Sequence, residues 1–200
     1  MTSGGLLPAY FRDHGLAGAR TAVLGTADSL AFVRAGGGVP IELGEGMEVD
    51  AVALCDDAGF DFLRGIELVL SAIVRAIDAG QTPALVLPNP DLVYPKGGGE
   101  LGFTAGAMAL VIEAALARRF PAIAPRFVPL GKPHAALLLA GAQRLAIDPA
   151  RLVMIGDQLE TDVAAARAAG ISPALLEGVT RWAHASASAS IAPDWLLDHL

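Results

Sequence analysis

The chain has 200 residues, 54% of them apolar and 18% charged, which argues against disorder and provides ample material for a core. Its formal net charge of −7 argues against a nucleic-acid backbone as partner, because such partners bind surfaces rich in lysine and arginine. The single cysteine, Cys55, excludes an internal disulfide framework and predicts a reducing, cytoplasmic location. We expect no secretory leader, because the first residues lack a basic and an apolar segment. We also expect no membrane span, because Glu67 and Arg75 interrupt the most apolar helical stretch, 66–77.

Helical and strand patterns alternate along the chain, which predicts an α/β protein with a parallel sheet. The helix at 61–79 has the clearest pattern, because its apolar residues recur every three or four positions. Between the elements, 88–91 is expected to form a rigid turn and 95–102 a glycine-rich loop. In chain order, the predicted elements are a helix at 3–14, a strand at 21–24, a helix at 26–35, a short edge strand at 39–43, a strand at 51–54, the helix at 61–79, a strand at 84–87, a helix at 104–119, a strand from 127, a helix at 134–145, a strand at 152–155, a helix at 163–169 and a strand at 171–176.

The most informative stretch begins with four apolar residues, 152–155, which predict a buried strand. The strand ends at Gly156, and Asp157 follows at its carboxyl end. Ligands of an open parallel sheet bind outside the carboxyl ends of its strands, so Asp157 is a candidate catalytic or metal-binding carboxylate. Asp162 falls near the start of the next helix, where free N–H groups also favour an acidic residue for purely structural reasons.

A second candidate turn, Gly131-Lys132-Pro133, precedes the helix at 134–145. Lys132 would place a positive charge at a strand end beside a helix N-terminus, which suits a phosphate oxygen; a solvated lysine in a turn is the alternative. Lys132 and Asp157 occupy corresponding positions on consecutive strand-to-helix junctions, so a right-handed crossover would bring them to one crevice. There they could hold a phosphate and Mg²⁺, which prefers few carboxylates together with water and phosphate oxygens.

Two motifs resemble the third and fourth motifs of the haloacid dehalogenase superfamily: Gly131-Lys-Pro133 and Met154-Ile-Gly-Asp-Gln-Leu-Glu-Thr-Asp162. The resemblance extends to the large α/β cap of the p-nitrophenylphosphatase-like branch, class IIA, at Thr21-Ala-Val-Leu-Gly25, Leu87-Pro-Asn-Pro-Asp91 and Thr104-Ala-Gly-Ala-Met108. The C-terminal end of that branch is resembled by Leu176-Glu-Gly-Val-Thr180 and Pro193-Asp-Trp195. The resemblance therefore covers nearly the whole chain.

By this resemblance, the chain would come from a Mg²⁺-dependent phosphomonoester hydrolase that acts on a small phosphorylated metabolite. Lys132 would neutralise the substrate phosphate, Asp157 would hold Mg²⁺, and Asp162 would support the lysine and the outer shell of the metal. Asn89 and Asp91 would lie near the leaving group of the substrate. A turn bounded by prolines also accounts for these last two residues.

The resemblance further implies a HAD-like Rossmannoid core with a large α/β cap domain. The cap would span 15–128 and the C-terminal half of the core 129–200, with a helix at 1–14 at their junction. If the protein forms an assembly, we expect a homodimer whose subunits contact each other through the cap.

The reaction of this family also needs an Asp-x-Asp motif ahead of the cap, whose first aspartate forms an aspartyl-phosphate. Asp56 and Asp57 follow a predicted strand, but Ala58 and Gly59 stand two positions after them, so neither fits the motif. We therefore expect a chain that is inactive alone, either a fragment or a short protein that keeps the cap and half of the core. The strand it lacks would lie beside 152–155, so we expect an unpaired edge and exposed apolar surface there, with poor solubility unless another chain or segment covers it.

Two other functions stay open. The first is a non-catalytic binding or interaction protein that associates with itself or a partner, through the cap or a strand edge. The second is a small nucleotide-binding α/β domain, although 97–99 does not lie in the strand-to-helix setting that a phosphate-binding glycine loop requires.

Overall fold

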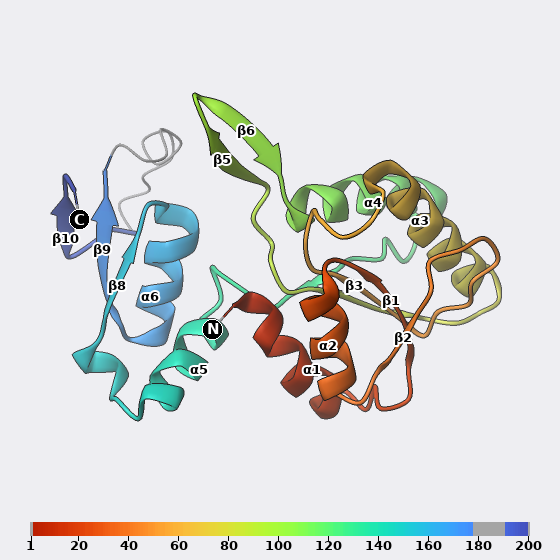
Figure 1. The fold of residues 1–200 in the computed structure, drawn as a ribbon, viewed down its shortest axis with the longest axis horizontal. Coiled ribbons are helices and arrows are strands. Elements are labelled where there is room, and N and C mark those ends of the chain that lie inside the picture. Colours follow the sequence, from red (N-terminus) through yellow and green to blue (C-terminus); the bar gives the residue numbers. More distant parts are fainter. Residues whose placement is uncertain (1, 178–190, 200) are drawn as a thin grey trace. The chain divides into compact units, whose positions relative to one another are not determined.

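The computed structural model describes residues 2–177 and 191–199, and the chain divides into two compact units, Thr2–Leu130 and Gly131–Leu200 (Figure 1). We call them the N-terminal unit and the C-terminal unit. Within the described ranges, no helix is both long and apolar enough to cross a bilayer.

A five-stranded parallel sheet with the order β2-β1-β3-β4-β7 forms the centre of the N-terminal unit. The inner strands β1, β3 and β4 are nearly continuous apolar runs, as expected for strands that are covered on both faces. The strands are β1 (Arg20–Leu24), β2 (Val39–Ile41), β3 (Ala51–Leu54), β4 (Ala84–Leu87) and β7 (Val128–Pro129).

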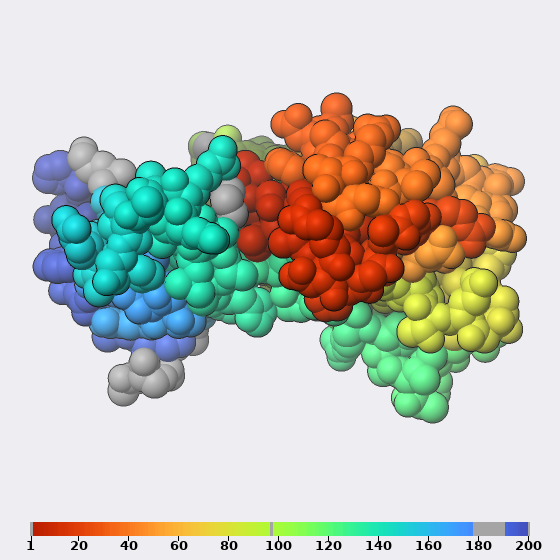
Figure 2. All heavy atoms as spheres, turned by 90° about the horizontal axis from the view of Figure 1, so that it is seen from below, coloured from red at the N-terminus to blue at the C-terminus, as the bar shows by residue number. Residues whose placement is uncertain are grey.

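Two pairs of helices cover the two faces of this sheet. On one face, α1 (Leu7–Asp13) and α2 (Ala27–Ala35) lie side by side, as the red and orange surface in Figure 2 shows, and bury Phe11 and Val33 against Val23 of β1. On the other face are α3 (Phe62–Asp78) and α4 (Ala105–Arg119). They bury an apolar stripe against the alternate residues of the same strands: Ile66, Val69, Ile73, Met108, Ile112 and Leu116 against Leu24, Val52, Leu54, Leu85 and Leu87. The predicted helix at 3–14 consists of a 3₁₀ turn (Ser3–Leu6) and α1.

The prediction of a glycine-rich loop at 95–102 is wrong, because this segment belongs to an antiparallel hairpin. Its strands are β5 (Val93–Gly97) and β6 (Glu100–Phe103), and they project from the amino end of α4 (Figure 1). Gly98 and Gly99 between them have φ values of +62° and +85°, the backbone that a tight two-residue hairpin turn requires. The glycines therefore mark the turn of a hairpin.

The C-terminal unit is built on a three-stranded parallel sheet with the order β10-β9-β8. The described helices of this unit pack on one face of the sheet, where Leu152 and Met154 contact Ala166, Ala169 and Leu138. The elements are α5 (Ala136–Leu145), a 3₁₀ turn (Pro149–Arg151), β8 (Val153–Gly156), a π-helical turn (Leu159–Val163), α6 (Ala164–Ala169), β9 (Ser172–Leu176) and β10 (Trp195–Leu197).

The strand predicted at 152–155 exists, but the prediction that it is buried is wrong. β8 lies at the edge of its sheet, and Val153 and Ile155 are 53% and 46% exposed. A run of apolar residues identifies a strand without showing whether both of its faces are covered. Among the described residues, β8 has no strand on its outer side, and its exposed apolar side chains agree with the surface expected there.

Candidate functional site

A buried carboxylate organises the polar groups at the carboxyl end of β8. Asp162 lies on the π-helical turn after that strand and is only 3% exposed. Its Oδ1 lies 2.5 Å from Nζ of Lys132. Its Oδ2 accepts hydrogen bonds from the backbone N–H groups of Asp157 and Gln158, at 3.0 and 3.2 Å. One carboxylate therefore holds both the lysine and the loop that follows the strand.

Gly156 makes this arrangement sterically possible. A Cβ atom at position 156 would lie 2.3 Å from Cβ of Asp162, far inside normal van der Waals contact. The glycine is therefore required by the close approach of the aspartate rather than by an unusual backbone angle. This explains why glycine and aspartate occur together in the motif.

The sequence analysis did not single out Gln158. Its N–H group donates to Asp162, and its Oε1 accepts a hydrogen bond from Oγ1 of Thr161 at 3.1 Å. Its position could have indicated this role. Gln158 lies four residues before Asp162 at the start of a helical turn, and a carboxylate there can accept hydrogen bonds from the free N–H groups of the turn.

The charges of the site differ in their access to solvent. Asp162 is a buried charge that is compensated by an ammonium and two N–H donors, the condition under which a buried carboxylate is tolerated. The side chain of Lys132 is 25% exposed. The ammonium can therefore reach a further anion while Asp162 fixes its position, and a phosphate oxygen is a suitable ligand.

The predicted site residues Lys132, Asp157 and Asp162 all lie in the C-terminal unit. Asp162 contacts both of the others. Lys132 contacts Asp162 through its side chain and Asp157 contacts it through its backbone, while the side chain of Asp157 is half-buried. In the ranges that the structure describes, no group of three or more His, Cys, Asp or Glu side chains could hold a metal ion. Asp157 alone offers Mg²⁺ one hard oxygen donor and should bind it weakly, because the ion would depend on water and phosphate oxygens for its other ligands.

Asn89 and Asp91 lie in the N-terminal unit, in the turn that follows β4. Oδ1 of Asn89 accepts the N–H of Asp91 at 3.4 Å, and Oγ1 of Thr104 donates to the carbonyl of Asp91. Gly106 lies so close to this turn that a Cβ would come within 2.2 Å of the carbonyl oxygen of Pro90. The turn is therefore fixed to the start of α4, and a role of Asn89 and Asp91 in binding the leaving group stays a prediction.

Asp56 and Asp57 follow β3 and close a local turn. Oδ1 of Asp56 accepts the N–H groups of Asp57 and Ala58, at 2.8 and 3.3 Å. Partial burial, and then the hydrogen bond with the side chain of Asp57, raises the pKa of Asp56. Burial also raises the pKa of the neighbouring Cys55 thiol to about 12, so this thiol is protonated at neutral pH and is a poor nucleophile. Both observations support a structural role for this turn.

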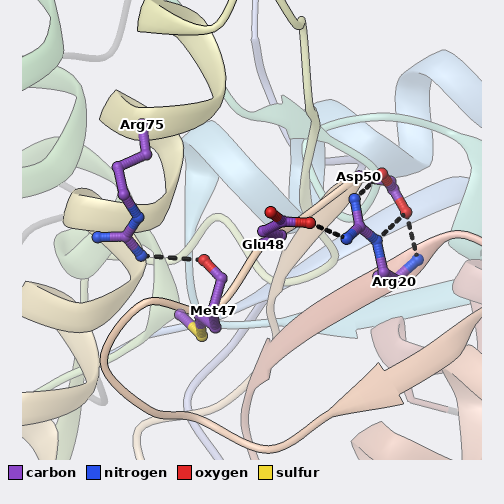
Figure 3. Close-up of polar contacts among 5 residues, drawn as sticks. All are labelled: Arg20, Met47, Glu48, Asp50 and Arg75. Carbon is purple, nitrogen blue, oxygen red and sulfur yellow. Dashed lines mark hydrogen bonds and ion pairs between the residues drawn. The ribbon is translucent and has the colours of Figure 1, made fainter.

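A second charged cluster lies at the amino end of the N-terminal sheet (Figure 3). Nε and Nη2 of Arg20 contact the two carboxylate oxygens of Asp50 at 2.9 Å, and Nη1 lies 2.5 Å from Oε2 of Glu48. Arg75 of α3 donates to the carbonyl of Met47 at 2.9 Å. The Arg20 guanidinium lowers the pKa of Asp50 to about 2, and the two carboxylates raise the pKa of Arg20. These contacts fasten the loop before β3 to β1 and α3, which is a structural function.

Comparison with known proteins identifies relatives of both units. Residues 129–200 match the model of the HAD-hydrolase-like family. Chronophin from Mus musculus is 30% identical over 173 residues, which cover 80% of this chain and 55% of chronophin. Chronophin from Rattus norvegicus is 28% identical over 185 residues, which cover 86% of this chain and 56% of chronophin. The chain thus spans about half the length of these curated relatives.

Solved structures have the same fold. A 4-nitrophenylphosphatase from Thermotoga maritima matches with a TM-score of 0.75 and 22% identity over 100% of this chain and 69% of that chain. A glycerol phosphate phosphatase from Mycobacterium tuberculosis, in complex with calcium, matches with a TM-score of 0.75 and 25% identity over 98% of this chain and 53% of that chain. The predicted α/β class with a Rossmann-like, haloacid dehalogenase-type core is therefore confirmed.

Proposed function

Because this chain is related to the class IIA phosphatases of the haloacid dehalogenase superfamily, we propose that it is part of a phosphomonoester hydrolase that acts on a small phosphorylated metabolite. The observation that carries the proposal is the contact of Lys132 with Asp162, 2.5 Å long, beside Asp157 at the carboxyl end of β8. In this proposal the N-terminal unit corresponds to the cap and the C-terminal unit to half of the core. The protein would act in the cytoplasm.

Each residue of the site has a distinct role in the proposal. The ammonium of Lys132 would bind a phosphate oxygen and offset its charge. Asp162 would act as a positioning residue, because it fixes Lys132 and the backbone of Asp157 at the same time. Asp157 would hold Mg²⁺, which when bound would offset further negative charge on the phosphate. Asn89 and Asp91 would contact the leaving group.

The reaction also requires a carboxylate nucleophile, since an aspartyl-phosphate forms when a carboxylate oxygen attacks phosphorus and the alcohol leaves. The 200 residues contain no Asp-x-Asp sequence, and the carboxylate of Asp56 accepts two N–H groups of its own turn. We therefore expect these 200 residues to bind phosphate with little or no turnover.

A fusion experiment tests the proposal. The segment of the Thermotoga maritima 4-nitrophenylphosphatase that has no counterpart here would be joined to this chain, and hydrolysis of 4-nitrophenyl phosphate would be followed with Mg²⁺. We expect turnover by the fusion, a loss of at least about 100-fold in Lys132→Met and Asp157→Asn variants, and almost none by the unfused chain. Equal turnover by the fused and unfused chains would refute our account of the nucleophile.

A calorimetric titration of the unfused chain with inorganic phosphate, with and without Mg²⁺, separates the roles of the site residues. Binding that weakens about tenfold in Lys132→Met, and a Mg²⁺ effect that disappears in Asp157→Asn, would support the roles given above. Phosphate binding that is indifferent to both changes would contradict them.

A non-catalytic binding protein is the second candidate function. The edge of β8 favours it, because this edge has no paired strand among the described residues and a strand edge can bind another chain. Phosphate binding by the unfused chain, combined with an inactive but folded fusion, would support this candidate over the hydrolase.

A further inference from the structure

A hollow of about 370 Å³ opens at the amino end of the N-terminal sheet, between the loop that precedes β3 and the end of α3. One wall is the loop 46–49. The other wall consists of residues from the last turns of α3 and just after it: Ala72, Arg75, Ala76, Ala79 and Gln81. The hollow lies wholly within the N-terminal unit, and its volume is in the range of pockets that hold small metabolites.

The hollow combines an apolar floor with a charged rim. Val49, Ala72 and Ala76 are buried, and the short side chains of the two alanines leave room above them. Arg75 and Glu48, which line the same hollow, are exposed. A floor of this kind suits an aliphatic carbon chain, and the rim suits charged groups.

Arg75 is held in place and has hydrogen-bond donors to spare. Its Nη2 donates to the carbonyl of Met47 at 2.9 Å, across the hollow from α3 to the loop (Figure 3). A guanidinium carries five N–H donors. Arg75 forms no ion pair within the described ranges, whereas Arg20 pairs with Glu48 and Arg64 with Glu45. Its remaining donors can therefore bind a carboxylate from solvent.

Glu48 supplies the opposite charge. Its Oε2 lies 2.5 Å from Nη1 of Arg20, which leaves Oε1 to accept a hydrogen bond from a ligand. Glu48 and Arg75 line one hollow, yet the ion pairs of the described residues do not join them to each other. A simple anion would meet Glu48 and a net charge of −7, and a simple cation would meet Arg75. A ligand that carries both charges avoids both repulsions.

We propose that this hollow binds a small amino acid in its zwitterionic form. The carboxylate of the ligand contacts Arg75, its ammonium contacts Glu48, and its carbon chain covers Ala72 and Ala76. The bound molecule bridges α3 and the loop before β3. The inference does not depend on the proposed hydrolase function, because it uses none of the residues placed in that site.

A titration followed by the NMR shifts of backbone amides tests the proposal. The probes are alanine, β-alanine and γ-aminobutyrate, whose charges lie at increasing separation, with propionate and propylamine as analogues that carry one charge each. We expect at least one of the three zwitterions to bind, with shifts in the amides of 46–49 and 75–81. Each singly charged analogue should bind at least about tenfold more weakly, because it lacks one charge-assisted contact.

Variants of the rim identify the groups that hold the ligand. Arg75→Gln and Glu48→Gln should each weaken the binding of the zwitterion by about tenfold or more, because each removes one charged partner. Arg34→Gln, the same change on an exposed residue of α2, is the matched control and should leave binding unchanged.

A blocking variant keeps both charges and the contact of Arg75 with Met47. Ala79 is an exposed residue of the rim, so Ala79→Leu should fill part of the hollow without disturbing the core, and should weaken binding as well. No binding of any of the three zwitterions, equal binding of propionate, or binding that Arg75→Gln and Ala79→Leu both leave intact would each overturn the proposal.

Discussion

Asp162 shows how far individual residues of the site could be predicted. The motif identified Lys132, Asp157 and Asp162, because a charged residue after a strand end is visible in the sequence. The resemblance implied that Asp162 supports the lysine, but it did not show their direct contact or that Asp157 takes part through its N–H group. Those facts depend on the π-helical turn after β8, which brings a residue five positions downstream back to the strand end. No periodicity in the sequence encodes that turn.

Replacing Gly156 by alanine adds only one methyl group, but it should disturb the site strongly. In Gly156→Ala, the new Cβ would collide with Asp162, so the contact with Lys132 should be lost along with about 2 kcal/mol or more of unfolding free energy. Gly141→Ala is the control, because a Cβ there meets nothing within 4 Å and alanine favours the helix that contains it. Urea unfolding of the two variants measures the difference, and equal stabilities would contradict the role assigned to Gly156.

The Arg20–Asp50 pair should make stability depend on pH in a defined window. The folded-state pKa of Asp50, about 2, lies below its ordinary value of 3.8. Its contribution is therefore fully present above about pH 4 and is lost as the pH falls towards 2. We expect the difference in Tm between wild type and Asp50→Asn to shrink by about half between pH 6 and pH 3. A difference that stays constant over this range would show that the pair does not stabilise the fold.

Among the elements, the inner strands of the N-terminal sheet were the most predictable. β1, β3 and β4 are short apolar runs bounded by turn residues, and their burial on both faces agrees with that pattern. The hairpin β5–β6 was missed because its glycines indicate a loop as readily as a tight turn. The burial of β8 was misjudged because exposure depends on which elements pack beside a strand, and the composition of the strand does not contain this information.

The connection from α4 to β7 allows a test of how a single buried side chain stabilises the packing of two elements. Glu113 is 8% exposed, accepts the N–H of Phe127 at 2.7 Å and pairs with Arg126 at 2.9 Å. Glu113→Ala would leave a buried N–H unsatisfied and should cost about 1–3 kcal/mol. Arg126→Ala should cost less than about 1 kcal/mol, because the arginine side chain is 68% exposed. Chemical denaturation distinguishes the two, and a larger loss in Arg126→Ala would reverse this assignment.

At the scale of the whole molecule, the two units differ in the size of their cores. The N-terminal sheet is buried between two helical layers. The described part of the C-terminal unit has only small apolar clusters, around Leu159, Val163 and Leu175 and around Ala166 and Ile171. Since buried apolar area is the main source of stability, the C-terminal unit should be the weaker of the two.

Hydrogen exchange measures this difference directly. We expect the amides of β8 and β9 to exchange well before those of β1, β3 and β4, through opening of the C-terminal unit. Inorganic phosphate should slow exchange in the C-terminal unit first, because the lysine that would bind it lies there. Uniform exchange across both sheets would indicate a single cooperative unit.

The exposed edge of β8 also affects how long the chain would survive in a cell. Holdase chaperones and proteases recognise apolar segments in extended conformation, and Val153 and Ile155 present such a segment in the folded state. The steady-state abundance of the protein would then depend on the occupancy of this edge as well as on the rate of synthesis.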